Sequence, residues 1–174
     1  MQIIMFIVHH TVRTLWSFFI GTIYAVAYWL ISRNNSTYKE NRQKWNNIKS
    51  LDDLVLFFQS EYKYKWDGIQ GICDHDNTSW EFLIDYGDCD DVARFAAKKL
   101  RKLGYKQAYR VGIFCFKNWA WHYDCMFVDK DGLYHLFNYG NILSGKTKDD
   151  CFSIFSQTWK NYPKSDTVNW RCFW

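Results

Sequence analysis

The chain has 174 residues, 48% of them hydrophobic and 21% aromatic, a composition that suits one domain with a packed core and excludes a disordered chain. Its net charge of +4 comes from lysines and arginines scattered among acidic residues, so no basic stripe predicts nucleic-acid binding. The six cysteines include no CxxC pair, which excludes a zinc ribbon or a thioredoxin motif.

The N-terminal segment is the most apolar part of the chain. Residues 15–32 contain no charged residue, and as a helix they would be about 27 Å long, just enough to cross a hydrocarbon core. We therefore interpret residues 1–35 as an apolar N-terminal helix that anchors the protein in a membrane. A cleaved signal peptide ending at Ala25-Val26-Ala27 and a buried helix of a soluble fold remain alternatives.

The charges that flank this segment predict its orientation. Arg13 precedes the apolar run, whereas four cations follow it: Arg33, Lys39, Arg42 and Lys44. The positive-inside rule then places the C-terminal part of the chain in the cytoplasm.

A polar tether and a folded domain are expected to follow. Residues 36–49 are polar and lack apolar periodicity, which indicates a tether, and residues 50–174 form the domain. The domain begins with a helix expected over residues 51–60, capped by Ser50.

The sequence GDCDDVARFAAKKLRKLG, which begins at Gly87, predicts the clearest helix. Asp88 is its expected N-cap, and Gly104 follows its last turn as a stop signal. Its expected inner face consists of Val92, Phe95, Ala96, Leu100 and Leu103.

Strand-like runs then cover residues 107–116, 120–128 and 133–139, and a further helix is expected over 148–160. The sequence Asp129-Lys130-Asp131-Gly132 predicts a hairpin turn between the last two strands. Helices followed by antiparallel strands indicate an α+β fold.

Cys89 stands in the first turn of the predicted helix, where the positive end of the macrodipole favours a thiolate. The neighbouring carboxylates oppose this effect, so a cationic partner is needed, and histidine is the usual one. Backbone N–H groups of the same turn could hold an oxyanion. These features together predict a nucleophilic cysteine.

His122, in the strand expected over 120–128, is the candidate base, and it shares a strand face with Asp124. The hairpin turn places His122 opposite a position between 138 and 141, a window that contains Asn138 and Asn141. An amide oxygen there could orient the imidazole. We choose Asn138, on the face of His122, and leave Asn141 as the alternative.

The sequence GDCDD and the helix that follows it resemble the nucleophile motif of the transglutaminase-like superfamily. The closest resemblance is to bacterial transglutaminase-like cysteine proteinases, over about residues 50–170, with "YKWD", "WEFL" and "LFN" as further matches. This resemblance implies a papain-like α+β core with Cys89 as nucleophile, His122 as base and acid, and Asn138 as the orienting residue. The family usually has Asp at that last position.

The resemblance also implies a cofactor and a reaction. Some members of the family bind calcium near the nucleophile, and Asp88 and Asp90 occupy such positions, although no cofactor is required for the chemistry. The expected function is a thiol-dependent amide hydrolase, a cysteine peptidase that acts on a protein or peptide. The alternatives are a transglutaminase or deamidase, a peptidoglycan amidase, and a non-catalytic membrane-anchored binding protein that keeps the fold.

Overall fold

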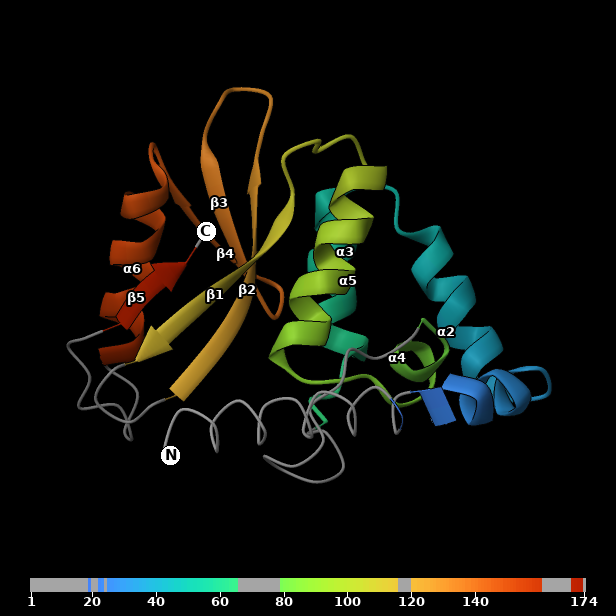
Figure 1. The fold of residues 1–174 in the computed structure, drawn as a ribbon. Helices are drawn as coiled ribbons and strands as arrows, with labels where there is room; N and C mark the ends of the chain where they lie inside the picture. The colour runs from blue at the N-terminus through green and yellow to red at the C-terminus, as the bar shows by residue number, and fades with distance from the viewer. Residues whose placement is uncertain are drawn as a thin grey trace, which may run out of the picture. The chain divides into compact units, whose positions relative to one another are not determined.

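The computed structural model describes residues 19, 22–23, 25–65, 79–115, 120–160 and 170–173 (Figure 1). The chain divides into two units, one formed by residues 1–47 and 63–91 and the other by residues 48–62 and 92–174. Each unit has its own internal packing.

In the first unit, α2 (Ser36–Asn47) packs against α4 (Ser79–Asp85). The Asn41 side chain donates a hydrogen bond from Nδ2 to the Leu83 carbonyl at 2.8 Å. The rings of Trp45 and Phe82 meet edge to face, with their centroids 6.0 Å apart. A polar and an aromatic contact therefore join the two helices.

The segment 36–49, expected to be a polar tether, is thus helical over most of its length. The helix begins after Asn35, whose Oδ1 accepts a hydrogen bond from the Tyr38 N–H at 2.9 Å. Tyr38, Asn41 and Trp45 lie on one helix face, and the first two are buried. The Asn41 amide, which bonds to the Leu83 backbone, lies in the middle of this face. It interrupts the apolar periodicity that would otherwise predict the helix.

In the second unit, α3 (Leu51–Leu56) and the π-helical turn η1 (Phe57–Glu61) confirm the helix expected over 51–60. Ser50 caps it as predicted. The Asp53 N–H donates to Ser50 Oγ at 3.1 Å, and the Ser50 N–H donates to Asp53 Oδ2 at 2.9 Å. These two hydrogen bonds form a capping box.

The helix predicted after Asp88 is α5 (Cys89–Lys102). It closes at Gly104, where the Gly104 N–H donates to the Arg101 carbonyl at 3.2 Å and the Tyr105 N–H donates to the Leu100 carbonyl at 3.0 Å. Four of the five expected inner positions are buried: Val92, Phe95, Ala96 and Leu100.

Among the described residues of the second unit, five antiparallel strands form one sheet, in the order β4-β3-β2-β1-β5 (Figure 1). β1, β2 and β3 confirm the predicted strands, whereas the two edge strands, β4 and β5, are not predicted from the sequence. The strands are β1 (Tyr109–Cys115), β2 (Ala120–Val128), β3 (Tyr134–Asn138), β4 (Asn141–Gly145) and β5 (Trp170–Phe173).

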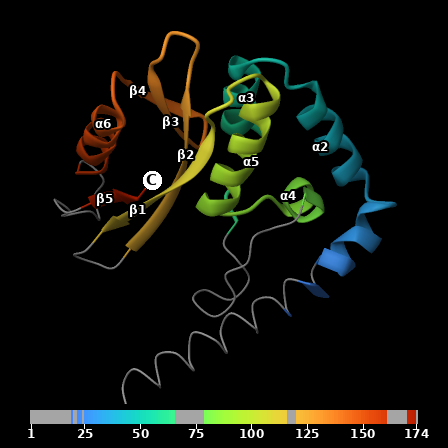
Figure 2. The ribbon, with the colours of Figure 1, turned by 45° about the horizontal axis from the view of Figure 1, so that its top comes forward.

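The predicted final helix is α6 (Lys148–Lys160), which packs against β3 and β4 (Figures 1 and 2). The Cys151 thiol of α6 donates to the Tyr134 carbonyl at 3.2 Å. Helix and sheet enclose a core cluster of buried residues: Val111, Ile113, Met126, Leu136, Cys151 and Phe155. The described residues therefore have the expected α+β architecture.

Gly140→Ala is expected to lower the free energy of unfolding by about 2–4 kcal/mol, because it combines backbone strain with overpacking. Gly140 lies in the turn between β3 and β4 with φ +83°. A Cβ there would lie 2.9 Å from the Val55 carbonyl oxygen and 2.9 Å from Gln59 Cγ. Urea denaturation of the variant measures the loss.

Gly132→Ala is the matched control. Gly132 has φ +81°, but no atom lies within 4 Å of its added Cβ. This variant therefore carries the strain alone, and we expect it to lose about 1–2 kcal/mol. Equal losses at Gly132 and Gly140 would contradict the close packing of the β3–β4 turn against α3 and η1.

The described part of the predicted membrane anchor exposes apolar side chains. Residues 25–32 are helical, whereas residues 15–18, 20, 21 and 24 lie outside the described residues. Within the described part of the chain, no helix has the length and apolar character needed to cross a membrane. The exposed large apolar residues of this segment are Phe19, Ile23, Val26, Trp29, Leu30 and Ile31.

Candidate active site

Cys89 is the first residue of α5 and carries a half-buried free thiol. Asp88 precedes it as the expected N-cap, and its Oδ1 accepts a hydrogen bond from the Asp90 N–H at 3.3 Å. The predicted position of Cys89 in the first helical turn is confirmed. The sulfur therefore lies at the end of the helix where the macrodipole favours negative charge.

The loop that leads into α5 requires glycine at position 87, two residues before Cys89. An added Cβ on Gly87 would lie 2.2 Å from Asp91 Oδ2 and 2.7 Å from Asp91 Cβ. The Gly87 carbonyl also accepts a hydrogen bond from the Lys65 N–H at 3.0 Å. Because the Asp91 carboxylate occupies the space of a side chain, the loop can pass close to the first turn of α5 only without a Cβ.

Three carboxylates surround the start of α5. Side-chain oxygens of Asp88, Asp90 and Asp91 all lie within 4.8 Å of one another. Asp90 and Asp91 are buried, whereas Asp88 is half-buried. One Ca²⁺ binds oxygen ligands at about 2.3–2.6 Å, so it can bridge oxygens separated by this distance. The three carboxylates therefore fit a calcium ion.

His122 lies on β2, where a carboxylate holds its ring. Nε2 of His122 is 3.0 Å from Oδ1 of Asp124, and both side chains are buried. The Phe155 ring stacks on the imidazole with a centroid distance of 5.7 Å, and the Tyr139 ring lies 6.0 Å away. The carboxylate and the two rings define one orientation of the imidazole.

Asp124 is a buried acid with a specific partner. Burial raises the pKa of its carboxyl, and the facing His122 imidazole opposes that rise. Its second oxygen, Oδ2, has no hydrogen-bond partner among the described residues. Asp124 therefore depends on His122 for the hydrogen bond that the structure gives it.

The residue chosen for this orienting role from the sequence is Asn138, the last residue of β3. Asn138 pairs with Asn141 across the turn to β4. The structure brings the Asp124 carboxylate within 3.0 Å of the imidazole, and a role for Asn138 or Asn141 stays a prediction. Cys89 belongs to the first unit, whereas His122, Asp124 and both asparagines belong to the second.

Two other cysteines whose side chains the structure describes, Cys125 and Cys151, do not suit nucleophilic chemistry. Cys125 and Cys151 are buried. Burial is the main factor that raises the pKa of both thiols, and the neighbouring carboxylates Asp124 and Asp150 add to it. Among the three cysteines whose side chains the structure describes, Cys89, Cys125 and Cys151, Cys89 is the accessible one.

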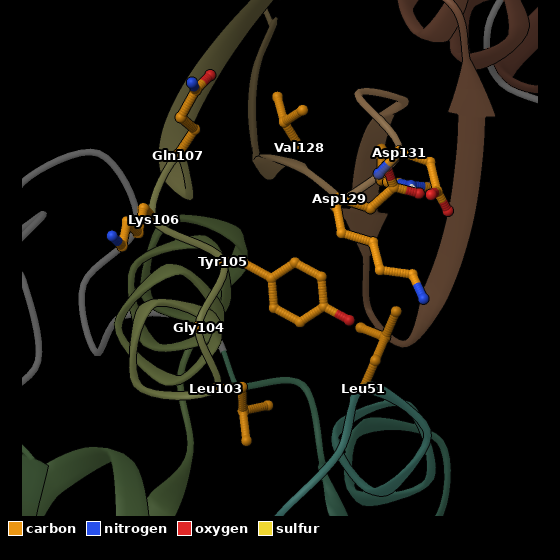
Figure 3. Close-up of a pocket in the computed structure, with 11 residues that line it drawn as sticks. Leu51, Leu103, Gly104, Tyr105, Lys106, Gln107, Val128, Asp129 and Asp131 are labelled. Carbon is orange, nitrogen blue, oxygen red and sulfur yellow. Dashed lines mark hydrogen bonds and ion pairs between the residues drawn. The ribbon is translucent and has the colours of Figure 1, made fainter.

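A separate pocket of about 540 Å³ lies in the second unit between the end of α5 and the β2–β3 turn. The Tyr105 ring extends into it, beside Leu51 and Leu103 (Figure 3). Its wall includes His135, which is fixed between Asp129 Oδ2 at 2.9 Å and Ser144 Oγ at 2.8 Å. None of the described residues that line this pocket is a cysteine, so it does not supply a nucleophilic thiol.

The comparison with known proteins rests on structure, because no family model and no curated protein matches the chain. The chain is similar to LapG of Legionella pneumophila, with 21% identity, a TM-score of 0.51, and coverage of 67% of this chain and 74% of that chain. The chain is also similar to the EGTA-treated and calcium-bound forms of LapG, each with 20% identity and a TM-score of 0.52. Both matches cover 71% of this chain, and they cover 75% of the EGTA-treated and 78% of the calcium-bound chain. The chain therefore has an α+β fold similar to that of LapG.

Proposed function

We propose that this chain is a thiol-dependent amide hydrolase, and specifically a cysteine peptidase. The observation that carries the proposal is the position of Cys89 at the first residue of α5 within a LapG-like fold. At that position a thiolate is favoured by the helix macrodipole, and the N–H groups of the first turn can receive an oxyanion.

The proposed reaction forms a thioester and then hydrolyses it. His122 removes the proton from the Cys89 thiol, and the sulfur attacks the carbonyl carbon of the scissile amide. The tetrahedral intermediate expels the amine, which takes the proton from His122. Water then attacks the thioester with His122 as base, which releases the acid and regenerates the thiol.

Asp124 is the proposed orienting residue. Its Oδ1 lies 3.0 Å from Nε2 of His122, so the proton on Nε2 can be donated to it. Nδ1 is then the nitrogen that accepts the thiol proton. Asp124 supplies the carboxylate that the resemblance leads us to expect at the third position, where Asn138 would contribute no charge.

A pooled peptide library, incubated with and without a primary amine and analysed by mass spectrometry, tests the reaction class. Peptide-bond cleavage is the expected result. Amine adducts or glutamate at glutamine positions would instead assign a transglutaminase or deamidase, and cleavage of peptidoglycan fragments in a separate arm would assign an amidase. No product in any arm, together with an unreactive Cys89, would identify a non-catalytic binding protein.

We also propose that calcium binds at Asp88, Asp90 and Asp91, whose side-chain oxygens lie within 4.8 Å of one another. The existence of calcium-bound and EGTA-treated LapG structures with the same fold supports this site. When bound, the ion offsets the negative charge that the three carboxylates place beside Cys89.

Calcium is expected to raise Tm by about 5–10 °C at about 100 times its Kd, because it binds the folded chain and not the unfolded one. Thermal unfolding with calcium, with magnesium and with EGTA measures the shift. The variant D88N/D90N should lose most of it. An equal Tm in calcium and EGTA, or an undiminished shift in the variant, would contradict the site.

A further inference from the structure

A cationic pocket of about 570 Å³ lies in the first unit, where the helical residues 25–32 meet α2. Two aromatic residues and three cations are among the residues that line it: Trp29, Tyr38, Arg33, Lys39 and Arg42. None of the described residues that line it is acidic. Three positive charges therefore share one concave surface.

The aromatic rings hold the two guanidinium groups. Arg33 Cζ lies 3.9 Å from the centroid of the Trp29 ring, and Arg42 Cζ lies 5.8 Å from that of Tyr38. In the part of the chain that the structure describes, neither arginine nor Lys39 forms an ion pair with a carboxylate.

The next lysine along α2 shows the contrast, because Lys44 pairs with Glu40 at 2.9 Å. The three cations of the pocket have no such internal neutralisation among the described residues. Arginine and lysine held in a concave site match the charge and the hydrogen-bond acceptors of a phosphate group. The pocket is therefore complementary to a phosphate.

The helical segment that carries Trp29 exposes apolar side chains. Ile23, Val26, Leu30 and Ile31 are each about half exposed, at 50%, 53%, 55% and 51%, and Trp29, which lines the pocket, is 40% exposed. Apolar side chains with a tryptophan and cations at one end are typical of segments that enter a membrane interface. This neighbourhood favours a lipid phosphate over a free one.

We propose that the pocket formed by Trp29, Arg33, Lys39 and Arg42 binds the phosphate of an anionic phospholipid headgroup. The exposed apolar side chains of the described residues Phe19, Ile23, Val26, Leu30 and Ile31 then contact the acyl chains of the same leaflet. The N-terminal segment can attach to a membrane through its apolar side chains. The headgroup contact adds an electrostatic contribution to that attachment, and this contribution depends on the lipid composition. This proposal does not rest on the proposed hydrolase activity.

Vesicle flotation of the full chain tests it. The chain is mixed with vesicles of phosphatidylcholine alone or of phosphatidylcholine with phosphatidylglycerol. We expect tighter binding to the second kind, and loss of that difference at high salt. The variant R33Q/K39Q/R42Q should weaken the part of the binding that depends on phosphatidylglycerol by about 100-fold, or about 5-fold for each cation.

The matched control is K63Q/K98Q/K146Q, which removes three exposed lysines and the same net charge elsewhere on the chain. It should bind nearly as wild type does, and so should C89A, which separates this proposal from the hydrolase. The single variant K39Q, at an exposed position, keeps the test decisive if the triple variant fails to fold.

Three results would overturn the proposal. The first is wild-type binding by the pocket variant, and the second is an equal loss in the control variant. The third is loss of vesicle binding in inorganic phosphate but not in sodium chloride of the same ionic strength, which would assign the pocket to a soluble phosphate.

Discussion

Replacement of Cys89 by alanine is expected to lower the rate of amide hydrolysis by at least about 10⁴-fold, because the thioester route needs the sulfur. Cys89→Ser should lose a similar amount, since a hydroxyl is a far weaker nucleophile without a base matched to it. The measurement is the initial rate on the peptide that the wild-type protein cleaves best. Full activity in either variant would show that Cys89 is not the nucleophile.

Two other thiols serve as controls. Cys125 and Cys151 are buried, and burial raises the pKa of both, so neither is available as a thiolate near neutral pH. Cys151→Ala should affect stability more than rate. Iodoacetamide at neutral pH should label Cys89 well before either buried thiol, and the opposite order would contradict the assignment.

Asp124→Ala is expected to lower kcat by between about 10²- and 10⁴-fold, because His122 loses the oxygen that orients it. Asp124→Asn should lose a comparable amount, up to about 10⁴-fold, since its amide can donate to the imidazole and hold the wrong tautomer. The asparagine variant is nearly isosteric, so it tests the role even if the alanine variant unfolds at this buried position.

The pH profile of Cys89 alkylation distinguishes positioning from a merely structural role. Without the carboxylate, the imidazolium that stabilises the thiolate is less stable, so alkylation of Asp124→Asn should begin at a higher pH than that of the wild-type protein. Asn138→Ala should leave both the profile and kcat nearly unchanged. A large loss at Asn138→Ala or Asn141→Ala, with little loss at Asp124→Asn, would return the orienting role to an asparagine.

The sequence predicts the elements whose signals are local. The Ser50 cap, the helix that starts at Cys89 and the turn at Asp129–Gly132 each depend on residues a few positions apart. The register of β2 against β3 is also predicted, because the turn fixes it. Cys125 pairs with Phe137, and the same register extended along β2 leads from His122 to position 140, inside the expected window of 138–141.

The remaining elements depend on contacts between distant segments. The helical state of residues 36–47 is supported by the hydrogen bond from Asn41 to Leu83, which no local pattern encodes. Strand β4 has five residues and β5 has four, too short for a clear alternation.

The orienting residue illustrates a different limit. The sequence places Asp124 on the same strand face as His122, two residues away. The expected hairpin register nevertheless directs attention to the neighbouring strand and to Asn138. The distance of 3.0 Å between Nε2 and Oδ1 is decided by side-chain rotamers within the packed sheet. The sequence places His122 and Asp124 on one strand face, but only the packed structure shows that the imidazole ring turns towards the Asp124 carboxylate.

Covalent labelling with a peptidyl vinyl sulfone, built on the cleaved sequence, tests the central claim most directly, because its thioether forms only with the attacking sulfur. Peptide mapping by mass spectrometry should find one adduct, on Cys89, and activity should fall in proportion to labelling. An adduct on another residue, or undiminished activity with Cys89 fully labelled, would contradict the account.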